Sequence, residues 1–274
     1  MTGEFAGARV VVTGAGRGLG RGIAESFAGL GAQVMLGART LEPALEAVAA
    51  IRARGGVAEA ARCDTSSHGD CTALVAAAVA ALGGIDVLIH CAADIPHGGL
   101  GQVSDERLEA GFASIAKGGW WLLDAARPHL AAAPQGGRFI AIGSVNGTAT
   151  VVPNMTAYGM AKAALLGFVR GAALDVVGDG ITVNAVQPGL IASDNARRVL
   201  GEEGLAAYGA TVPVGRAGTV DDFAHACQFF ASPRAGYVTG ASLVMDGGSS
   251  LAPGRGGRGD ILQDRLRAQT GAEQ

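Results

Sequence analysis

The stretch Arg9-Val-Val-Val-Thr-Gly14-Ala-Gly-Arg-Gly-Leu-Gly20 decides the fold class of this chain of 274 residues. Its apolar first half is typical of a buried strand, and the apolar-periodic residues 23–30 that follow indicate a helix. Glycines allow the tight turn between them and a close approach to a pyrophosphate, whose charge a helix N-terminus favours. The segment predicts a dinucleotide-binding turn; the alternative is a glycine turn without a ligand, since 45 residues are glycine.

Strand-like and helical runs alternate along the rest of the chain. Strands are expected at residues 33–37, 57–63, 85–91, 137–142, 181–187 and 242–246. Helices are expected at residues 41–54, 70–82, from 104 onward, 158–177 and 219–231. This alternation predicts an α/β fold: a single-domain, Rossmann-type, doubly wound parallel sheet of about seven strands with helices on both faces. We expect that domain at residues 1–250. Residues 251–274 are expected to form a polar extension, either disordered or packed on a neighbouring subunit.

Composition excludes several classes of function. The formal net charge is −3 with mixed signs, which gives no electrostatic footprint for nucleic acid. Uncharged stretches are too short to span a bilayer, and a strand within ten residues of the start leaves no room for a signal peptide, so a cytoplasmic protein is expected. Four cysteines without C-x-x-C spacing and five scattered histidines predict neither disulfides nor a metal.

A second motif, Tyr158-Gly-Met-Ala-Lys162, lies further along the chain with Ser144 upstream. Lysine is scarce, because only two of the 21 basic residues are lysines, Lys117 and Lys162. Positions i and i+4 share one face of a helix, and an ammonium beside a phenol favours the phenolate and so lowers the phenol's pKa. The pair therefore indicates a tuned acid/base; the alternative is an ordinary surface pair.

Together these segments resemble the short-chain dehydrogenase/reductase family from about Arg9 to Ser249. The resemblance also includes Cys63-Asp64, residues 85–90, Asn184-Ala-Val-Gln-Pro-Gly189 and Val244-Met-Asp-Gly-Gly248. It implies an NAD(P)-dependent alcohol dehydrogenase or carbonyl reductase, built as a homotetramer or dimer and acting on a small-molecule carbonyl or alcohol.

The resemblance also implies roles for individual residues. Tyr158 would exchange a proton with the substrate oxygen, Lys162 would lower the Tyr158 pKa and bind the nicotinamide ribose, and Ser144 would donate to the oxyanion. His97 and Asn146 are further candidates for substrate contact. Alternatives are a strand-terminal serine for Ser144 and a helix N-cap for the adenine-binding Asp64. The implied cofactor-binding residues are Gly14, Arg17, Gly18, Leu19, Gly20, Arg39, Cys63, Asp64, Cys91, Ala92, Tyr158, Lys162, Pro188, Gly189, Ile191 and Ser193.

Two departures from the family pattern stand out. The family's Asn-Asn-Ala-Gly is replaced by His90-Cys-Ala-Ala93, which adds a methyl group where the backbone and the cofactor come close. The family's catalytic asparagine, counted back from Pro128, falls on Ile115, whose side chain cannot hold the water of the proton relay. Ser114 would point about 100° away from that direction on a regular helix.

Cofactor choice is read at the end of the second strand. A carboxylate there binds the ribose of NAD, but this chain has Arg39, whose fork of donors suits a 2′-phosphate, with Arg17 as a second cation. The sequence therefore favours NADP, with NAD as the alternative if Arg39 is only a solvated loop residue. The predicted protein is an NADP(H)-dependent oxidoreductase. Its rivals are an NAD-dependent dehydrogenase of a cyclic diol or sugar alcohol, and a catalytically weak dinucleotide-binding regulator.

Overall fold

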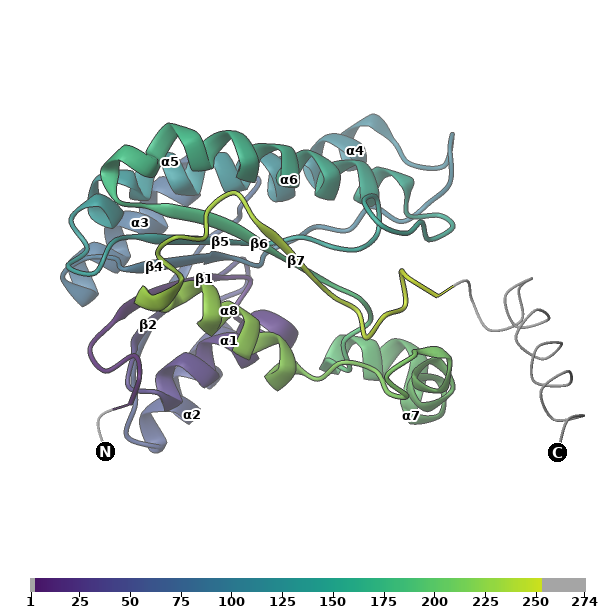
Figure 1. Ribbon diagram of the computed structural model, residues 1–274, viewed down its shortest axis with the longest axis horizontal. Helices are drawn as coiled ribbons and strands as arrows, with labels where there is room; N and C mark the ends of the chain where they lie inside the picture. Colours follow the sequence, from purple (N-terminus) through teal and green to yellow (C-terminus); the bar gives the residue numbers. More distant parts are fainter. Residues whose placement is uncertain (1–2, 253–274) are drawn as a thin grey trace, which may run out of the picture.

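A seven-stranded, entirely parallel sheet forms the centre of the computed structural model, which describes residues 3–252 (Figure 1). The strand order is β3-β2-β1-β4-β5-β6-β7, so the order reverses between β1 and β4. The strands are β1 (Arg9–Thr13), β2 (Gln33–Ala38), β3 (Val57–Arg62), β4 (Val87–His90), β5 (Arg138–Ile142), β6 (Thr182–Pro188) and β7 (Ser242–Met245). The predicted doubly wound sheet is confirmed, and every predicted strand is present within a few residues of its expected bounds.

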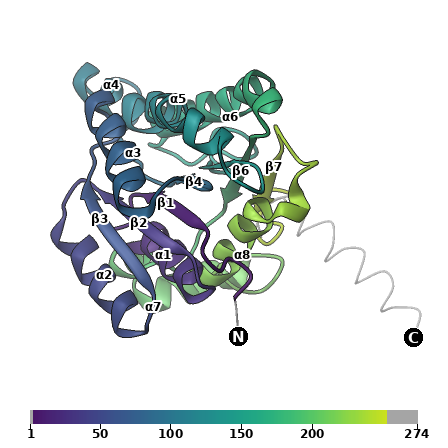
Figure 2. The same ribbon diagram turned by 90° about the vertical axis from the view of Figure 1, so that its left-hand side faces the viewer.

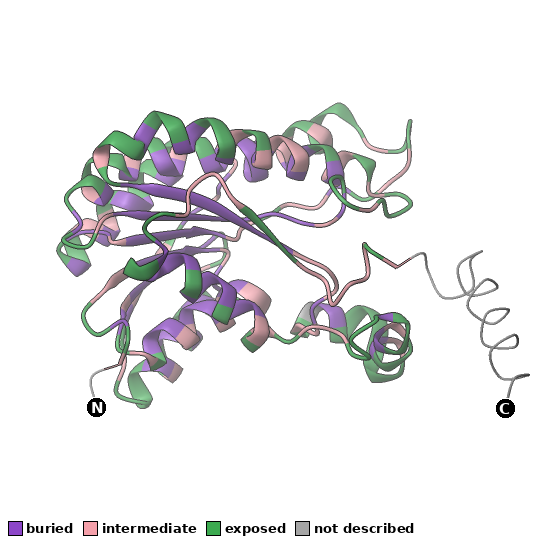
Figure 3. Cartoon of the chain, in the orientation of Figure 1, coloured by how far each residue is buried: buried purple, intermediate pink, exposed green. Residues whose placement is uncertain are grey.

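Helices cover both faces of the sheet (Figure 2). One face carries α1 (Gly18–Gly29), α2 (Glu42–Ala53) and α8 (Val220–Ala231). The other carries α3 (His68–Leu82), α4 (Asp105–Phe112), α5 (Gly118–Ala131) and α6 (Thr156–Val176). The five inner strands are buried along almost their whole length, whereas the edge strands β3 and β7 are partly exposed, as are the outer faces of the helices (Figure 3). Each face of the sheet has its own apolar core.

Two helical features differ from the sequence-based prediction. The long helix expected from residue 104 contains a π-helical turn, Ala113–Lys117, between α4 and α5. Helix α7 (Asp194–Thr211), for which no helix was predicted, follows the end of β6 and carries a non-helical Gly201. Both lie where tertiary contacts rather than a simple periodicity set the backbone.

Residues 253–274, most of the predicted extension, lie outside the described residues. Within residues 3–252, no helix combines the length and the apolar character that a bilayer-crossing segment needs. In the same range, no group of three or more His, Cys, Asp or Glu side chains is placed to hold a metal ion.

Candidate active site

The candidate residues gather at the carboxyl ends of the strands, the edge at which open α/β sheets bind ligands. The glycine turn follows β1, Cys91 and Ala92 follow β4, and Ser144 follows β5. Helix α6 places Tyr158 and Lys162 on the turns nearest that edge, because Lys162 reaches the carbonyl of Ile142 at the end of β5. The single site expected from the sequence is thus assembled by the topology.

Ser144, Tyr158 and Lys162 form one cluster. The Lys162 ammonium lies 5.7 Å from the centroid of the Tyr158 ring, and its Nζ donates to the Ile142 carbonyl at 2.5 Å. The buried Ser144 side chain hydrogen-bonds the Tyr158 phenol, which lowers the phenol's pKa, and its Oγ accepts from the Asn146 backbone N–H at 3.1 Å. The alternative, that Ser144 is a strand-terminal serine that satisfies the backbone, therefore accounts for its bond to the Asn146 N–H but not for its bond to Tyr158.

Burial dominates the protonation of this cluster. It raises the pKa of Tyr158 to about 12, against the opposing effect of the Ser144 hydrogen bond. It lowers the pKa of Lys162 to about 8, which a nearby Cys91 thiol opposes. The expectation that Lys162 lowers the Tyr158 pKa is not met in this structure, because burial outweighs other effects and the ammonium points to a carbonyl. The Tyr158 phenol is therefore neutral at pH 7.

The glycine turn is packed so closely that side chains would not fit. Gly14 has φ +67°, and a Cβ there would lie 2.8 Å from the Cα of Ala92 on the neighbouring strand end. A Cβ on Gly20 would lie 2.4 Å from the Gly14 carbonyl oxygen. Gly18, with φ +56°, faces open space, and its nearest neighbour is the Cβ of Ser193 at 3.9 Å. The turn thus holds β1 against β4 while leaving room above its tip.

The start of α1 fits the pyrophosphate of a dinucleotide. Its N-cap residue, the exposed Arg17, makes no side-chain capping bond, and the first turn contains no acidic residue. In contrast, α3, α7 and α8 are capped by Ser67, Ser193 and Thr219. The first N–H groups of α1 are therefore left for an anion, which the helix dipole also favours. Leu19 packs partly buried against the core beneath.

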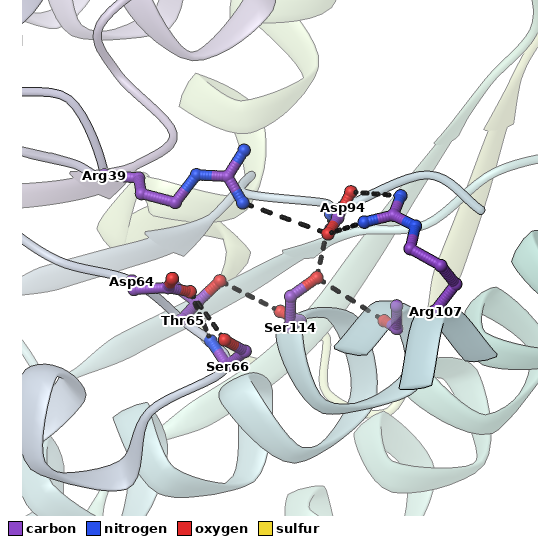
Figure 4. A network of polar contacts seen from close by, with 8 residues as sticks. Arg39, Asp64, Thr65, Ser66, Asp94, Arg107 and Ser114 are labelled. Atoms are coloured by element: carbon purple, nitrogen blue, oxygen red, sulfur yellow. Dashed lines mark hydrogen bonds and ion pairs between the residues drawn. The ribbon is translucent and has the colours of Figure 1, made fainter. Parts of the chain in front are cut away.

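At the end of β2, Arg39 extends over the sheet edge toward a carboxylate (Figure 4). Its side chain is 60% exposed, and its Nη1 lies 3.9 Å from Asp94 Oδ2. Asp94 accepts two hydrogen bonds from Arg107, at 3.0 and 3.1 Å, and its backbone N–H donates to Ser114 Oγ at 2.8 Å. Arg39 is thus a loosely held cation, whereas the charge of Asp94 is already matched by Arg107.

The structure refines the predicted adenine-binding residues after β3. Asp64 Oδ1 accepts from the backbone N–H and the hydroxyl of Ser66, at 3.0 and 2.7 Å, so it closes its own turn. The alternative that Asp64 caps a helix is wrong, because Ser67 caps α3. Cys63 is buried in the core beside Cys71, and its interaction with the Cys71 thiol, together with burial, raises the pKa of the Cys63 thiol. Only the backbone of Cys63 is left for the predicted cofactor contact.

The predicted substrate residues have different surroundings. Asn146 is buried, with its Oδ1 accepting from the Val152 N–H at 3.0 Å and its Nδ2 donating to the Met155 carbonyl at 3.4 Å, so it braces the loop before α6. His97 is exposed on the loop after β4, which pairs with the same region because the Gly98 N–H donates to the Asn154 carbonyl at 2.9 Å. Substrate contact by either residue stays a prediction.

The segment after β6 closes the opposite side of the site. Pro188 ends the strand, and a Cβ on Gly189 would lie 2.8 Å from the Cβ of Asp246. Ile191 is buried in the core, and Ser193 accepts from the Ala196 N–H at 3.4 Å as the cap of α7. Ser193 lies across from Gly18, because a Cβ on Gly18 would lie 3.9 Å from the Ser193 Cβ. Contact of Ser193 with the cofactor stays a prediction.

Sequence reasoning treated His90 only as a departure from the family and overlooked its partner Thr13. The Thr13 hydroxyl accepts from the N–H groups of Cys91 and Ala92, at 3.1 and 3.2 Å, so its proton is left for His90 Nδ1 at 3.1 Å. His90 Nε2 must then carry the proton and donate to the Ile115 carbonyl at 3.0 Å. Burial lowers the pKa of His90 to about 4, which keeps the ring neutral. The sequence did offer a signal for this pair, because Thr13 and His90 are polar residues at the ends of two strands that are neighbours in the sheet.

The Ile115 side chain is fully buried in the apolar core, so it faces away from the polar cluster. The Ser114 hydroxyl accepts from Asp94 and lies 3.4 Å from the Gly111 carbonyl, to which it donates. Ile115 and Ser114 are thus both committed to structural contacts. How the proton relay runs without an asparagine at position 115 stays a prediction.

An α/β fold with a glycine turn, a serine–tyrosine–lysine cluster and an uncapped first helix defines a nucleotide-dependent oxidoreductase. The family described as Enoyl-(Acyl carrier protein) reductase matches residues 14–250. The chain is 37% identical to L-rhamnose 1-dehydrogenase (NAD(P)(+)) of Azotobacter vinelandii, over 87% of this chain and 95% of that protein. It is 34% identical to 3-oxoacyl-[acyl-carrier-protein] reductase FabG of Escherichia coli, over 89% and 98%.

Solved structures agree with these relatives. A short-chain type dehydrogenase/reductase from Mycobacterium ulcerans superimposes with a TM-score of 0.84 at 28% identity, covering 91% of this chain and 92% of that one. The chain belongs to the short-chain dehydrogenase/reductase family, whose members are oxidoreductases that use NAD(P).

Proposed function

We propose that this protein is an NADP(H)-dependent oxidoreductase that interconverts a carbonyl and an alcohol on a small organic substrate. The observation that carries the proposal is the cluster in which Ser144 hydrogen-bonds the Tyr158 phenol and the Lys162 ammonium lies 5.7 Å from the ring. This cluster lies at the same sheet edge as the glycine turn, so a proton donor and a dinucleotide site adjoin.

Each residue has a distinct task in carbonyl reduction. Tyr158, with its pKa raised to about 12, keeps its proton until the substrate oxygen gains negative charge and then donates it. Ser144 donates a second hydrogen bond to that oxygen and so stabilises the charge that develops there. Lys162, whose ammonium lies 5.7 Å from the Tyr158 ring, would hydrogen-bond the nicotinamide ribose. The nicotinamide, when bound, supplies or accepts the hydride at the substrate carbon.

The preference for NADP rests on the end of β2. Arg39 is mostly exposed, and the only carboxylate that the described structure places near it, Asp94, is 3.9 Å away and held by Arg107. A 2′-phosphate would give this guanidinium a closer and more strongly charged partner. No acid at the end of β2 is present to bind the ribose of NAD, because residues 38 and 39 are Ala and Arg.

A second candidate is an NAD-dependent dehydrogenase of a cyclic diol or sugar alcohol. The similarity to L-rhamnose 1-dehydrogenase (NAD(P)(+)) favours it, since that relative's name combines a sugar with both cofactors. The same Tyr158 would then accept a proton. Steady-state rates on a panel of ketones, diols and sugars with each cofactor separate the two. The first proposal fails if turnover with NAD(H) is faster than turnover with NADP(H) on every substrate of the panel.

We also propose that the protein acts as a homo-oligomer, a tetramer or dimer. The outer faces of α5 and α6 expose large apolar side chains, including Trp120 and Leu174, which a second subunit would cover. Light scattering on the purified protein tests this, and a monomer at micromolar concentration contradicts it.

A further inference from the structure

A cavity of about 240 Å³ lies at the amino ends of the strands. This edge of the sheet is opposite to the edge formed by the carboxyl ends, where the candidate active site lies. Arg138, the first residue of β5, lines it, whereas Ser144 follows the last residue of that strand. Several residues around the cavity, such as Glu4 and Gln135, are exposed, so it is open to solvent. The other lining residues come from the segment before β1, from β4, from the loop before β5 and from the end of α8.

Arg138 is only 4% exposed, yet its guanidinium is incompletely bonded. Its Nη1 donates to the Gly137 carbonyl at 2.9 Å and its Nη2 to the Gln135 carbonyl at 3.2 Å, while its Nε is buried and has no partner. An arginine carries five N–H donors, so these two bonds leave most of them unused. Buried donors of a charged group normally find acceptors.

The charge of Arg138 is also unmatched among residues 3–252. Both hydrogen bonds of its guanidinium end on backbone carbonyls rather than on a carboxylate, and burial lowers the pKa of Arg138. Asp86, which lines the cavity, is already bound by Arg9 through the backbone N–H at 2.7 Å and through Nε at 2.8 Å. Glu4 lies exposed at the rim. An arginine remains ionised even when buried, and a buried charge without a partner is strongly unfavourable.

A second buried polar side chain next to Arg138 also has an unsatisfied atom. Thr182 Oγ1 is the other buried side-chain polar atom without a hydrogen-bond partner in the described part of the chain. Thr182 pairs in register with Arg138 across β5 and β6, so both side chains leave the same face of the sheet. Of the two unsatisfied groups, Arg138 lines the cavity and Thr182 is its neighbour in the sheet, so a polar partner for Arg138 is missing at the cavity.

We propose that this cavity binds a small oxyanion, a carboxylate or phosphate group, on the Arg138 guanidinium. Its volume corresponds to roughly eight water molecules, which suits an anion of a few heavy atoms rather than a nucleotide. Water could accept a hydrogen bond there but would not neutralise the charge. The exposed carboxylate of Glu4 at the rim disfavours a highly charged polyanion.

Calorimetric titration of the full-length protein with inorganic phosphate, and separately with acetate, tests this site in the presence of saturating NADPH. The cofactor keeps the anion from binding in the active site. We expect one site per chain, at least ~10-fold weaker in Arg138→Met, because charge-assisted hydrogen bonds are lost. Preference for phosphate or acetate identifies the source of the oxyanion.

Glu4→Gln is a second variant for the case in which Arg138→Met does not fold. Because Glu4 is exposed, its substitution should leave the fold intact. Removing the rim carboxylate should tighten anion binding, whereas Arg52→Ala, which removes an exposed arginine of α2 that does not line the cavity, should leave it unchanged. The proposal is overturned if neither anion binds, since water or a turn of Arg138 toward Thr182 then satisfies the buried groups. It is also overturned if Glu4→Gln has no effect while Arg52→Ala weakens binding.

Discussion

Lys162→Met is expected to make the protein more stable at neutral pH while stopping the reaction. Lys162 is 2% exposed, its ammonium has one carbonyl partner, and no carboxylate contributes to its pKa. Methionine has a similar shape and no charge, so it removes the desolvation penalty and keeps the packing. Lys162 is thus a destabilising group at a position where the proposed mechanism needs it.

The magnitude follows from the pKa of Lys162. Burial lowers it from 10.5 to about 8, and each pKa unit corresponds to ~1.36 kcal/mol, so the buried charge costs roughly 3 kcal/mol at pH 7. Losing the hydrogen bond to the Ile142 carbonyl offsets about 1 kcal/mol of this. We therefore expect Lys162→Met to raise the free energy of unfolding by roughly 2 kcal/mol at pH 7.

The pH dependence distinguishes this cause from better packing. Between pH 8 and 10.5 the unfolded chain holds the lysine proton more tightly than the folded chain, so wild-type stability rises with pH across that window. The advantage of the variant should be complete below pH 8 and shrink across that window, and above pH 10.5 the variant should be less stable by about 1 kcal/mol, because only the lost hydrogen bond to Ile142 then counts. Urea unfolding of both proteins without cofactor, at equal concentration, measures the difference at each pH. A variant that is less stable at pH 7, or whose advantage does not change with pH, refutes the reasoning.

Three further predictions concern the site. Tyr158→Phe should lower turnover by at least ~10²-fold and leave cofactor binding intact; near-normal turnover contradicts the proton-donor role. Arg39→Ala should weaken NADP(H) far more than NAD(H) in fluorescence titrations, and equal losses count against the 2′-phosphate contact. His90→Leu should destabilise by about 1–3 kcal/mol in urea unfolding, because the Thr13 hydroxyl and the Ile115 carbonyl lose their partner; unchanged stability shows that other groups replace it.

The sheet was predictable because its strands are short apolar runs punctuated by glycine. Helix α7 was not, since its sequence contains few large apolar residues and includes Gly201 with φ +67°. The π-helical turn was also hidden, because the residues that favour it, Thr65 and His90, lie far away in the sequence. Local signals thus define the elements, and long-range polar contacts define their irregularities.

Within the site, the sequence identified which residues meet but not how they are held. The motif spacing placed Ser144, Tyr158 and Lys162 together, as the structure shows. It did not reveal that burial raises the pKa of Tyr158, because the depth of a side chain depends on the surrounding layers. Nor did it reveal the internal bonds of Asn146, which form only once the loop before α6 has folded back.

The π-helical turn Ala113–Lys117 also bears on which changes of chain length this fold can accept. The wider hydrogen-bond spacing of this turn leaves two of its carbonyls free for side chains. The Ser114 carbonyl accepts from the Thr65 hydroxyl at 3.1 Å, and the Ile115 carbonyl accepts from His90 Nε2 at 3.0 Å. Deleting one residue there would restore a regular helix but rotate everything before it by about 100°, carrying Arg107 away from Asp94. Homologues that vary in length should therefore gain or lose residues in the exposed loop before α6, not here.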